Sequence, residues 1–125
     1  MIPSTKISQT ILEFGKAAIL ELPKNHTKEE FEATMKMVVL AWNVVVMDQQ
    51  EKGNRFELEF MLLMETAPAK VKLIVKRLLK RKKTKFASDP RGVGNYWVRE
   101  ENGGLVFGCE ARLNVEDVDC TSSIH

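Results

Sequence analysis

A run of basic residues without any acid is the part of the sequence best suited to chemistry. Residues 67–88 contain nine Lys or Arg side chains and no Asp or Glu. Basic side chains gathered on one helix bind phosphate backbones or other polyanions by releasing counterions, and a nearby exposed Trp can stack on a base. The candidate polyanion-binding residues are those of the basic helix 76–85 and three that follow it: Lys76, Arg77, Lys80, Arg81, Lys82, Lys83, Lys85, Arg91, Trp97 and Arg99.

The same run is also typical of a solvated helix face. The 125-residue chain has 19 Lys and Arg against 17 Asp and Glu, a formal net charge of +2. Residues 1–66 carry a net charge of −3 and residues 89–125 one of −4, so acidic faces or an acidic tail could neutralise the basic helix. No recognised nucleic-acid motif accompanies the run, so it favours a nucleic-acid backbone or an acidic protein partner over readout of a base sequence.

Residues that bind metals or act as nucleophiles are few. Cys109, Cys120 and His125 are spaced C-x10-C-x4-H, which does not match a compact zinc motif. His26 is expected in a loop, where a solvated histidine is commoner than a catalytic one. We therefore predict no catalytic residue, metal, cofactor or small-molecule ligand. An enzyme built from carboxylates that the fold brings together stays open.

Large apolar side chains are numerous enough to form either a core or an interaction surface. They are Trp42, Met35, Met37 and Met47 together with the apolar residues of 56–64. The six methionines suit irregular packing or an adaptable contact surface. The leading functional hypothesis is therefore a non-enzymatic protein-interaction module, with a nucleic-acid-associated protein as the alternative.

Helices followed by a hairpin would position these residues, which makes the predicted class α+β. Apolar residues at helical spacing predict the helices, and an alternating pattern near the C-terminus predicts the strands. The predicted elements are four helices at about 5–22, 28–48, 55–65 and 68–85, and antiparallel strands at 95–100 and 105–112. We predict one globular domain over 1–115 and a disordered acidic tail at 116–125.

Four local signals concern the helices. Thr27 and Glu30 match a capping box at the start of the second helix, although its Val-rich half would also suit a strand. Asn54 resembles a cap for the third helix. Asn43 needs a hydrogen-bond partner if it is buried in the second helix. Gly15 weakens the first helix unless another backbone approaches it closely.

The Asn102-Gly103 pair predicts a two-residue hairpin turn that fixes the strand register. Val98 then lies opposite Phe107, and Trp97 lies over Gly108 on the outer face. The residues predicted on the inner face are Tyr96, Val98, Leu105, Phe107, Cys109 and Ala111. Gly92-Val93-Gly94 is predicted as a turn before the strand. A lone hairpin leaves two open edges, which two copies could pair into a four-stranded sheet, so we predict a homodimer.

The chain ends and apolar stretches bear on location. The N-terminus lacks the features of a signal peptide, and the longest apolar stretch, 37–47, is too short to span a membrane. Two cysteines are too few for a disulfide-stapled scaffold. These features predict a cytoplasmic, reduced protein.

Three local patterns together resemble a group of small bacterial proteins of unknown function. The patterns are Trp42-Asn43-Val44-Val45-Val46, the exit of the basic helix from Lys82-Lys83 to Phe86-Ala87-Ser88-Asp89-Pro90-Arg91, and Tyr96-x-Val98 with Glu110-Ala111-Arg112. The resemblance covers nearly the whole chain up to residue 112. It implies a compact single-domain bacterial protein and supplies no activity, ligand or catalytic residue.

Overall fold

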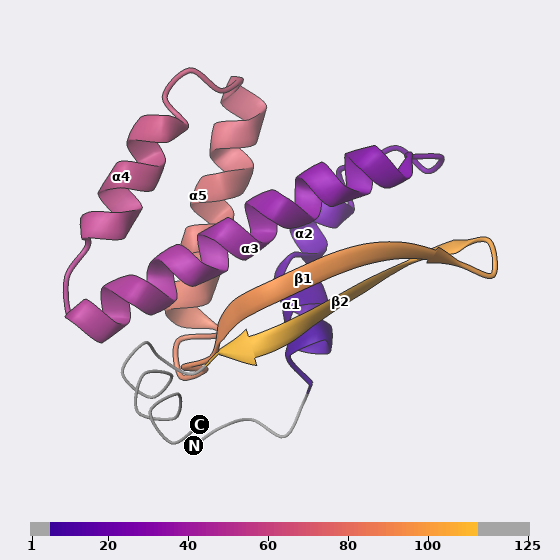
Figure 1. The fold of residues 1–125 in the computed structure, drawn as a ribbon. Helices are drawn as coiled ribbons and strands as arrows, with labels where there is room; N and C mark the ends of the chain where they lie inside the picture. The colour runs from indigo at the N-terminus through magenta and orange to yellow at the C-terminus, as the bar shows by residue number, and fades with distance from the viewer. Residues whose placement is uncertain (1–5, 113–125) are drawn as a thin grey trace.

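Five helices precede a two-stranded antiparallel sheet in the computed structural model, which describes residues 6–112 (Figure 1). The elements are α1 (Ile7–Phe14), α2 (Lys16–Ile19), α3 (Lys28–Glu51), α4 (Arg55–Leu63), α5 (Ala69–Thr84), β1 (Gly92–Glu101) and β2 (Gly104–Arg112). The predicted α+β class with a C-terminal hairpin is confirmed. The tail predicted at 116–125 lies outside the described residues. Within those residues, no helix is both long and apolar enough to cross a membrane.

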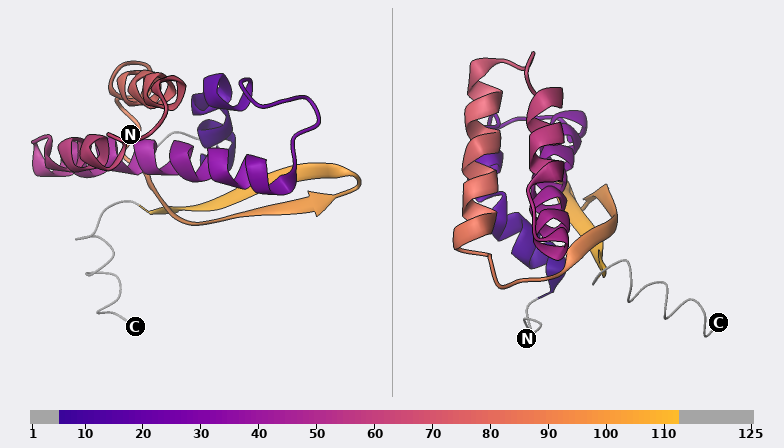
Figure 2. Two further views of the ribbon diagram at one scale, coloured as in Figure 1. Left: turned by 90° about the horizontal axis from the view of Figure 1, so that it is seen from above. Right: turned by 90° about the vertical axis from the view of Figure 1, so that its left-hand side faces the viewer.

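Helix α3 runs through the centre of the molecule. The hairpin lies along one side of α3, and α2 and α5 lie on the other (Figure 2). Trp42 of α3 is fully buried, and its ring meets those of Phe14 and Phe86 edge to face at centroid distances of 5.1 and 5.8 Å. These three rings join α1, α3 and the segment after α5 into one core.

Local hydrogen bonds define α3 at its start and attach it to the sheet. The predicted capping box is present: Thr27 Oγ1 accepts from the Glu30 N–H at 3.1 Å, and the Thr27 N–H donates to Glu30 Oε1 at 2.8 Å. The Asn43 side chain donates to the Val93 carbonyl at 2.9 Å and accepts from the Val93 N–H at 2.7 Å. Asn43 therefore has the partner that its position required, and that partner is the backbone of β1.

The first predicted helix is interrupted at Gly15, where the structure has two short helices in place of one helix at 5–22. A Cβ atom at Gly15 would lie 2.7 Å from Cγ1 and 2.9 Å from Cγ2 of Val38. Such distances are shorter than van der Waals contact, so only glycine allows α3 to approach this closely. Glycine is thus required by the side chain of Val38, and not by the approach of another backbone expected from the sequence.

The cap of α4 comes from Asp48 and not from Asn54, so that prediction is wrong. The Asn54 side chain forms no capping hydrogen bond. Asp48, near the end of α3, is buried and accepts from the N–H groups of Phe56 and Glu57 at 2.8 and 2.9 Å. The carboxylate therefore satisfies the free donors at the start of α4 from outside the helix, and it holds the α3–α4 corner.

The hairpin has the predicted register, with Val98 opposite Phe107 and Trp97 opposite Gly108. Asn102 and Gly103 both have positive φ, as a two-residue hairpin turn requires. A Cβ at Gly108 would clash with the Trp97 indole, so Trp97 does cover this glycine.

The start of β1 differs from the prediction. Residues 92–94, predicted as a turn, belong to β1, and an irregularity follows between Val93 and Tyr96. Val93 is buried, and the Asn43 amide bonds to its backbone, which explains why this segment stays extended. Tyr96 and Ala111, predicted on the inner face, are exposed, but the Tyr96 ring lies 6.2 Å from that of the buried Phe107 and Ala111 pairs with the buried Val93.

Candidate functional site

The buried Lys82 is not part of an exposed basic surface, contrary to the prediction. Its Nζ donates to the carbonyls of Phe86 and Asp89 at 2.7 and 2.9 Å and lies 4.4 Å from the centre of the Trp42 ring. Burial lowers the pKa of Lys82 to about 8, and the charge of Asp89 opposes this change. Lys82 therefore holds the segment that follows α5 against the core.

Arg91 is also buried, so its predicted place on the basic surface is wrong as well. Its guanidinium contacts both carboxylate oxygens of Asp89, with Nε 3.0 Å from Oδ1 and Nη2 2.7 Å from Oδ2. Nη2 also donates to Thr10 Oγ1 at 3.2 Å, and the Arg91 carbonyl accepts from Trp42 Nε1 at 2.6 Å. Burial alone would raise the pKa of Asp89, but the hydrogen bonds and charge of Arg91 outweigh it and lower that pKa.

Two further candidates, Arg81 and Lys83, are held by neighbouring segments. Arg81 donates to the carbonyls of Phe14 and Glu13, both at 3.1 Å, and so satisfies the C-terminal end of α1. Lys83 forms an ion pair of 2.7 Å with Glu57 of α4. The acidic N-terminal half thus covers part of the basic helix, as the alternative interpretation of the sequence allowed.

Lys76, Arg77 and Lys80 are the candidates that the structure brings together. They are exposed on the outer face of α5, and they form no ion pair with any residue of 6–112. Lys85 is exposed farther along, with Nζ 5.9 Å from the centre of the Phe86 ring.

Trp97 and Arg99 lie on a different part of the molecule. The hairpin that carries them is on the opposite side of α3 from α5 (Figure 2). The guanidinium of Arg99 lies 5.8 Å from the centre of the Trp97 ring, and its Nε lies 3.8 Å from Glu101. Trp97 and Arg99, like the buried Lys82 and Arg91, therefore do not share a surface with the outer face of α5.

Exposed leucines lie beside those three cations and were not identified as exposed from the sequence. Leu58, Leu62 and Leu63 of α4 are 57%, 68% and 80% exposed, and Leu73 of α5 is 50% exposed. Helices α4 and α5 run side by side, joined by a short connection and by the Lys83–Glu57 ion pair (Figures 1 and 2). We call the outer side of these helices the α4–α5 surface; its residues are Leu58, Glu59, Leu62, Leu63, Glu65, Leu73, Lys76, Arg77 and Lys80.

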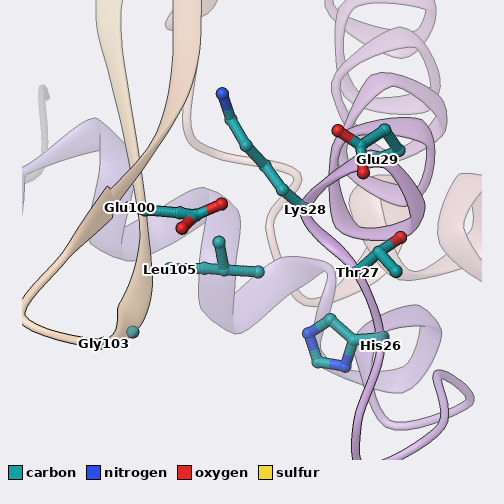
Figure 3. Close-up of a pocket in the computed structure, with 8 residues that line it drawn as sticks. His26, Thr27, Lys28, Glu29, Glu100, Gly103 and Leu105 are labelled. Carbon is teal, nitrogen blue, oxygen red and sulfur yellow. The ribbon is translucent and has the colours of Figure 1, made fainter.

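A separate open cleft of about 390 Å³ lies between the hairpin turn and the start of α3 (Figure 3). Its lining combines His26, Lys28 and Glu29 with Glu100 and Leu105. The Nδ1 of His26 lies 2.7 Å from the Pro23 carbonyl oxygen, which holds the ring against its own loop. The cleft thus places charges of both signs around a histidine that is already engaged.

Groups suited to metal binding or nucleophilic chemistry are sparse in residues 6–112. No three His, Cys, Asp or Glu side chains of this part of the chain are placed to hold a metal ion. Cys109 is half-buried, and burial raises its pKa to about 11, which favours the unreactive thiol over the thiolate. The α4–α5 surface is therefore the candidate site with the clearest chemistry, which is association.

Comparison of the chain with protein-family models, with curated proteins and with solved structures finds no match. The resemblance to small bacterial proteins stays a prediction.

Proposed function

We propose that the protein is a non-enzymatic, cytoplasmic interaction module that binds a protein partner through the α4–α5 surface. The observation that carries this proposal is the group of four leucines on two neighbouring helices, each at least half exposed. Large exposed apolar side chains on one part of a surface are unfavourable in water, and such groups mark binding sites on folded proteins. The bound state would remove these side chains from water.

A photo-crosslinking experiment tests this use of the surface. Leu62 is replaced by p-benzoylphenylalanine, and the matched control carries the same residue at Leu20, which is 72% exposed but follows α2. We expect defined protein adducts from position 62 in cells and none from position 20. Equal, diffuse labelling from both positions would show that the α4–α5 surface has no protein partner.

The alternative proposal is a nucleic-acid-associated protein, and it now depends on fewer residues. It is supported by the three cations of α5 that have no acidic partner in residues 6–112, Lys76, Arg77 and Lys80. We would expect binding to DNA or RNA that weakens steeply with added salt and is lost when the three are changed to Glu. No binding at low salt would exclude this function.

A further inference from the structure

We infer that the partner of the α4–α5 surface is a second copy of this chain, with α4 of one protomer packed against α5 of the other. This inference rests on the proposed interaction function and specifies its partner. It follows from the distribution of charges around the exposed leucines.

The two helices carry opposite charges at their outer sides. Glu59 and Glu65 are exposed and form no ion pair within residues 6–112, although the charge of Glu59 acts on Arg55 one turn earlier in α4. Lys76 and Lys80 of α5 are exposed and equally without an ion pair in that part of the chain. The exposed side of α4 thus carries acids and leucines, and that of α5 carries bases and Leu73, so α4 of one copy is complementary in charge to α5 of another.

The Lys83–Glu57 ion pair fixes how far along each helix these groups lie. From that pair the helices run in opposite directions along the chain, and each residue advances about 1.5 Å along its helix axis. Glu59 is then at about the level of Lys80. This acid and this base therefore match in height along the two helices.

A two-fold axis parallel to the helices uses this match twice. Rotation about such an axis places α4 of one protomer over α5 of the other at the same level, and each contact recurs by symmetry. Glu59 would meet Lys80 of the second copy. By the same count Leu62 and Leu63 lie about 6–8 Å along the axis from Leu73 of the second copy, so the leucines add apolar area to a small four-helix bundle without facing one another directly.

The same features disfavour a nucleic acid or an anionic membrane as the occupant. Phosphate groups placed over the leucines would lie beside Glu59 and Glu65, where like charges repel. Leucine also lacks the aromatic face on which bases stack. The contact further differs from the homodimer predicted from the sequence, which paired the strand edges of two hairpins.

Sedimentation velocity of the full chain, in a micromolar concentration series, tests the inference. We expect a monomer–dimer equilibrium. Leu62→Asp should raise the dimer dissociation constant at least about tenfold, because it places an unpaired charge in the interface. The matched control is Leu20→Asp, also on an exposed leucine, which should leave the constant unchanged. Circular dichroism of each variant confirms that the fold is retained.

Exchanging the charges of Glu59 and Lys80 gives a second test, because a misfolded variant would not recover dimer formation. Glu59→Lys and Lys80→Glu should each weaken the dimer roughly tenfold, and the double variant should return to within about threefold of the original constant. A monomer at all concentrations, or a dimer that ignores Leu62→Asp and the exchange, would overturn the inference. If position 62 then still cross-links to a different protein, the proposed interaction function stands while the second copy is excluded.

Discussion

Lys82 places its ammonium group 4.4 Å from the centre of the Trp42 ring, beneath two backbone carbonyls, in the interior of the protein. The adjacent Lys83 is exposed and pairs with Glu57. Two neighbouring lysines of one basic helix thus have different roles, because one lies on the apolar stripe of α5 and the other beside it.

Replacing Lys82 by Ala should destabilise the fold by about 2–4 kcal/mol. The substitution removes a buried side chain and the ammonium group that donates to the carbonyls of Phe86 and Asp89. Lys83→Ala is the matched control and should cost less than about 1 kcal/mol, since it breaks an exposed ion pair. Urea unfolding at neutral pH measures both, and equal losses would contradict the assigned role of Lys82.

The free energy of unfolding should rise with pH through the Lys82 contribution. The pKa of Lys82 is lowered from 10.5 to about 8 in the folded protein, so between these values the unfolded chain binds more protons. Stability attributed to Lys82 then increases from about pH 8 to pH 10.5, by at most about 3 kcal/mol.

Cys109 acts in the opposite direction, because burial raises its pKa from 9.0 to about 11 and the folded state then holds the proton. The measurement is therefore the difference between the unfolding free energies of the original protein and Lys82→Met over this pH range. A difference that does not change with pH would refute the lowered pKa.

Asp48→Ala should destabilise the protein by about 1–2 kcal/mol, because it removes the carboxylate that accepts from Phe56 and Glu57 at the start of α4. Asn54→Ala provides the comparison: its side chain makes no capping bond, so we expect a change within about 0.5 kcal/mol. Thermal unfolding distinguishes the two variants. A larger effect at Asn54 would restore the cap expected from the sequence.

Gly15→Ala should destabilise the protein by about 1–3 kcal/mol, because the new methyl group would meet both Cγ atoms of Val38. Val38→Ala makes room for it, so the double variant should cost less than the sum of the single changes. At Gly53 nothing lies within 4 Å of a Cβ, and Gly53→Ala serves as the uncrowded control. Additive losses in a double-mutant cycle would show that the two positions are not in contact.

Local patterns predicted the parts of the fold that short segments determine by themselves. The Asn102-Gly103 turn and the alternating residues gave the hairpin register, and Thr27 with Glu30 marked the start of α3. The predictions failed where a distant segment decides the local structure. Position 15 requires glycine because Val38 approaches it closely, and Asp48 replaces Asn54 as the cap because of the α3–α4 corner.

The candidate site was only partly predictable for the same reason. Helical spacing from Val75 and Leu78 places Lys82 on the buried stripe, a signal that the run of basic residues obscured. The buried Arg91 contacts Thr10, far away in the chain, and no local pattern indicates that contact. The exposure of the α4 leucines depends on how that helix packs, because a short helix that is apolar on most sides does not reveal which side faces solvent.

The Asn43 amide blocks the addition of a further strand at the start of β1. It occupies both the N–H and the carbonyl of Val93, the two groups through which a further strand would add to β1 at that position. The Asn43 side chain of α3 thus makes the two hydrogen bonds that a residue of a neighbouring strand would make to Val93, and the sheet ends there. Asn43→Leu would keep the bulk and reopen that edge, so its effect should be seen first in fibril formation or precipitation on prolonged incubation.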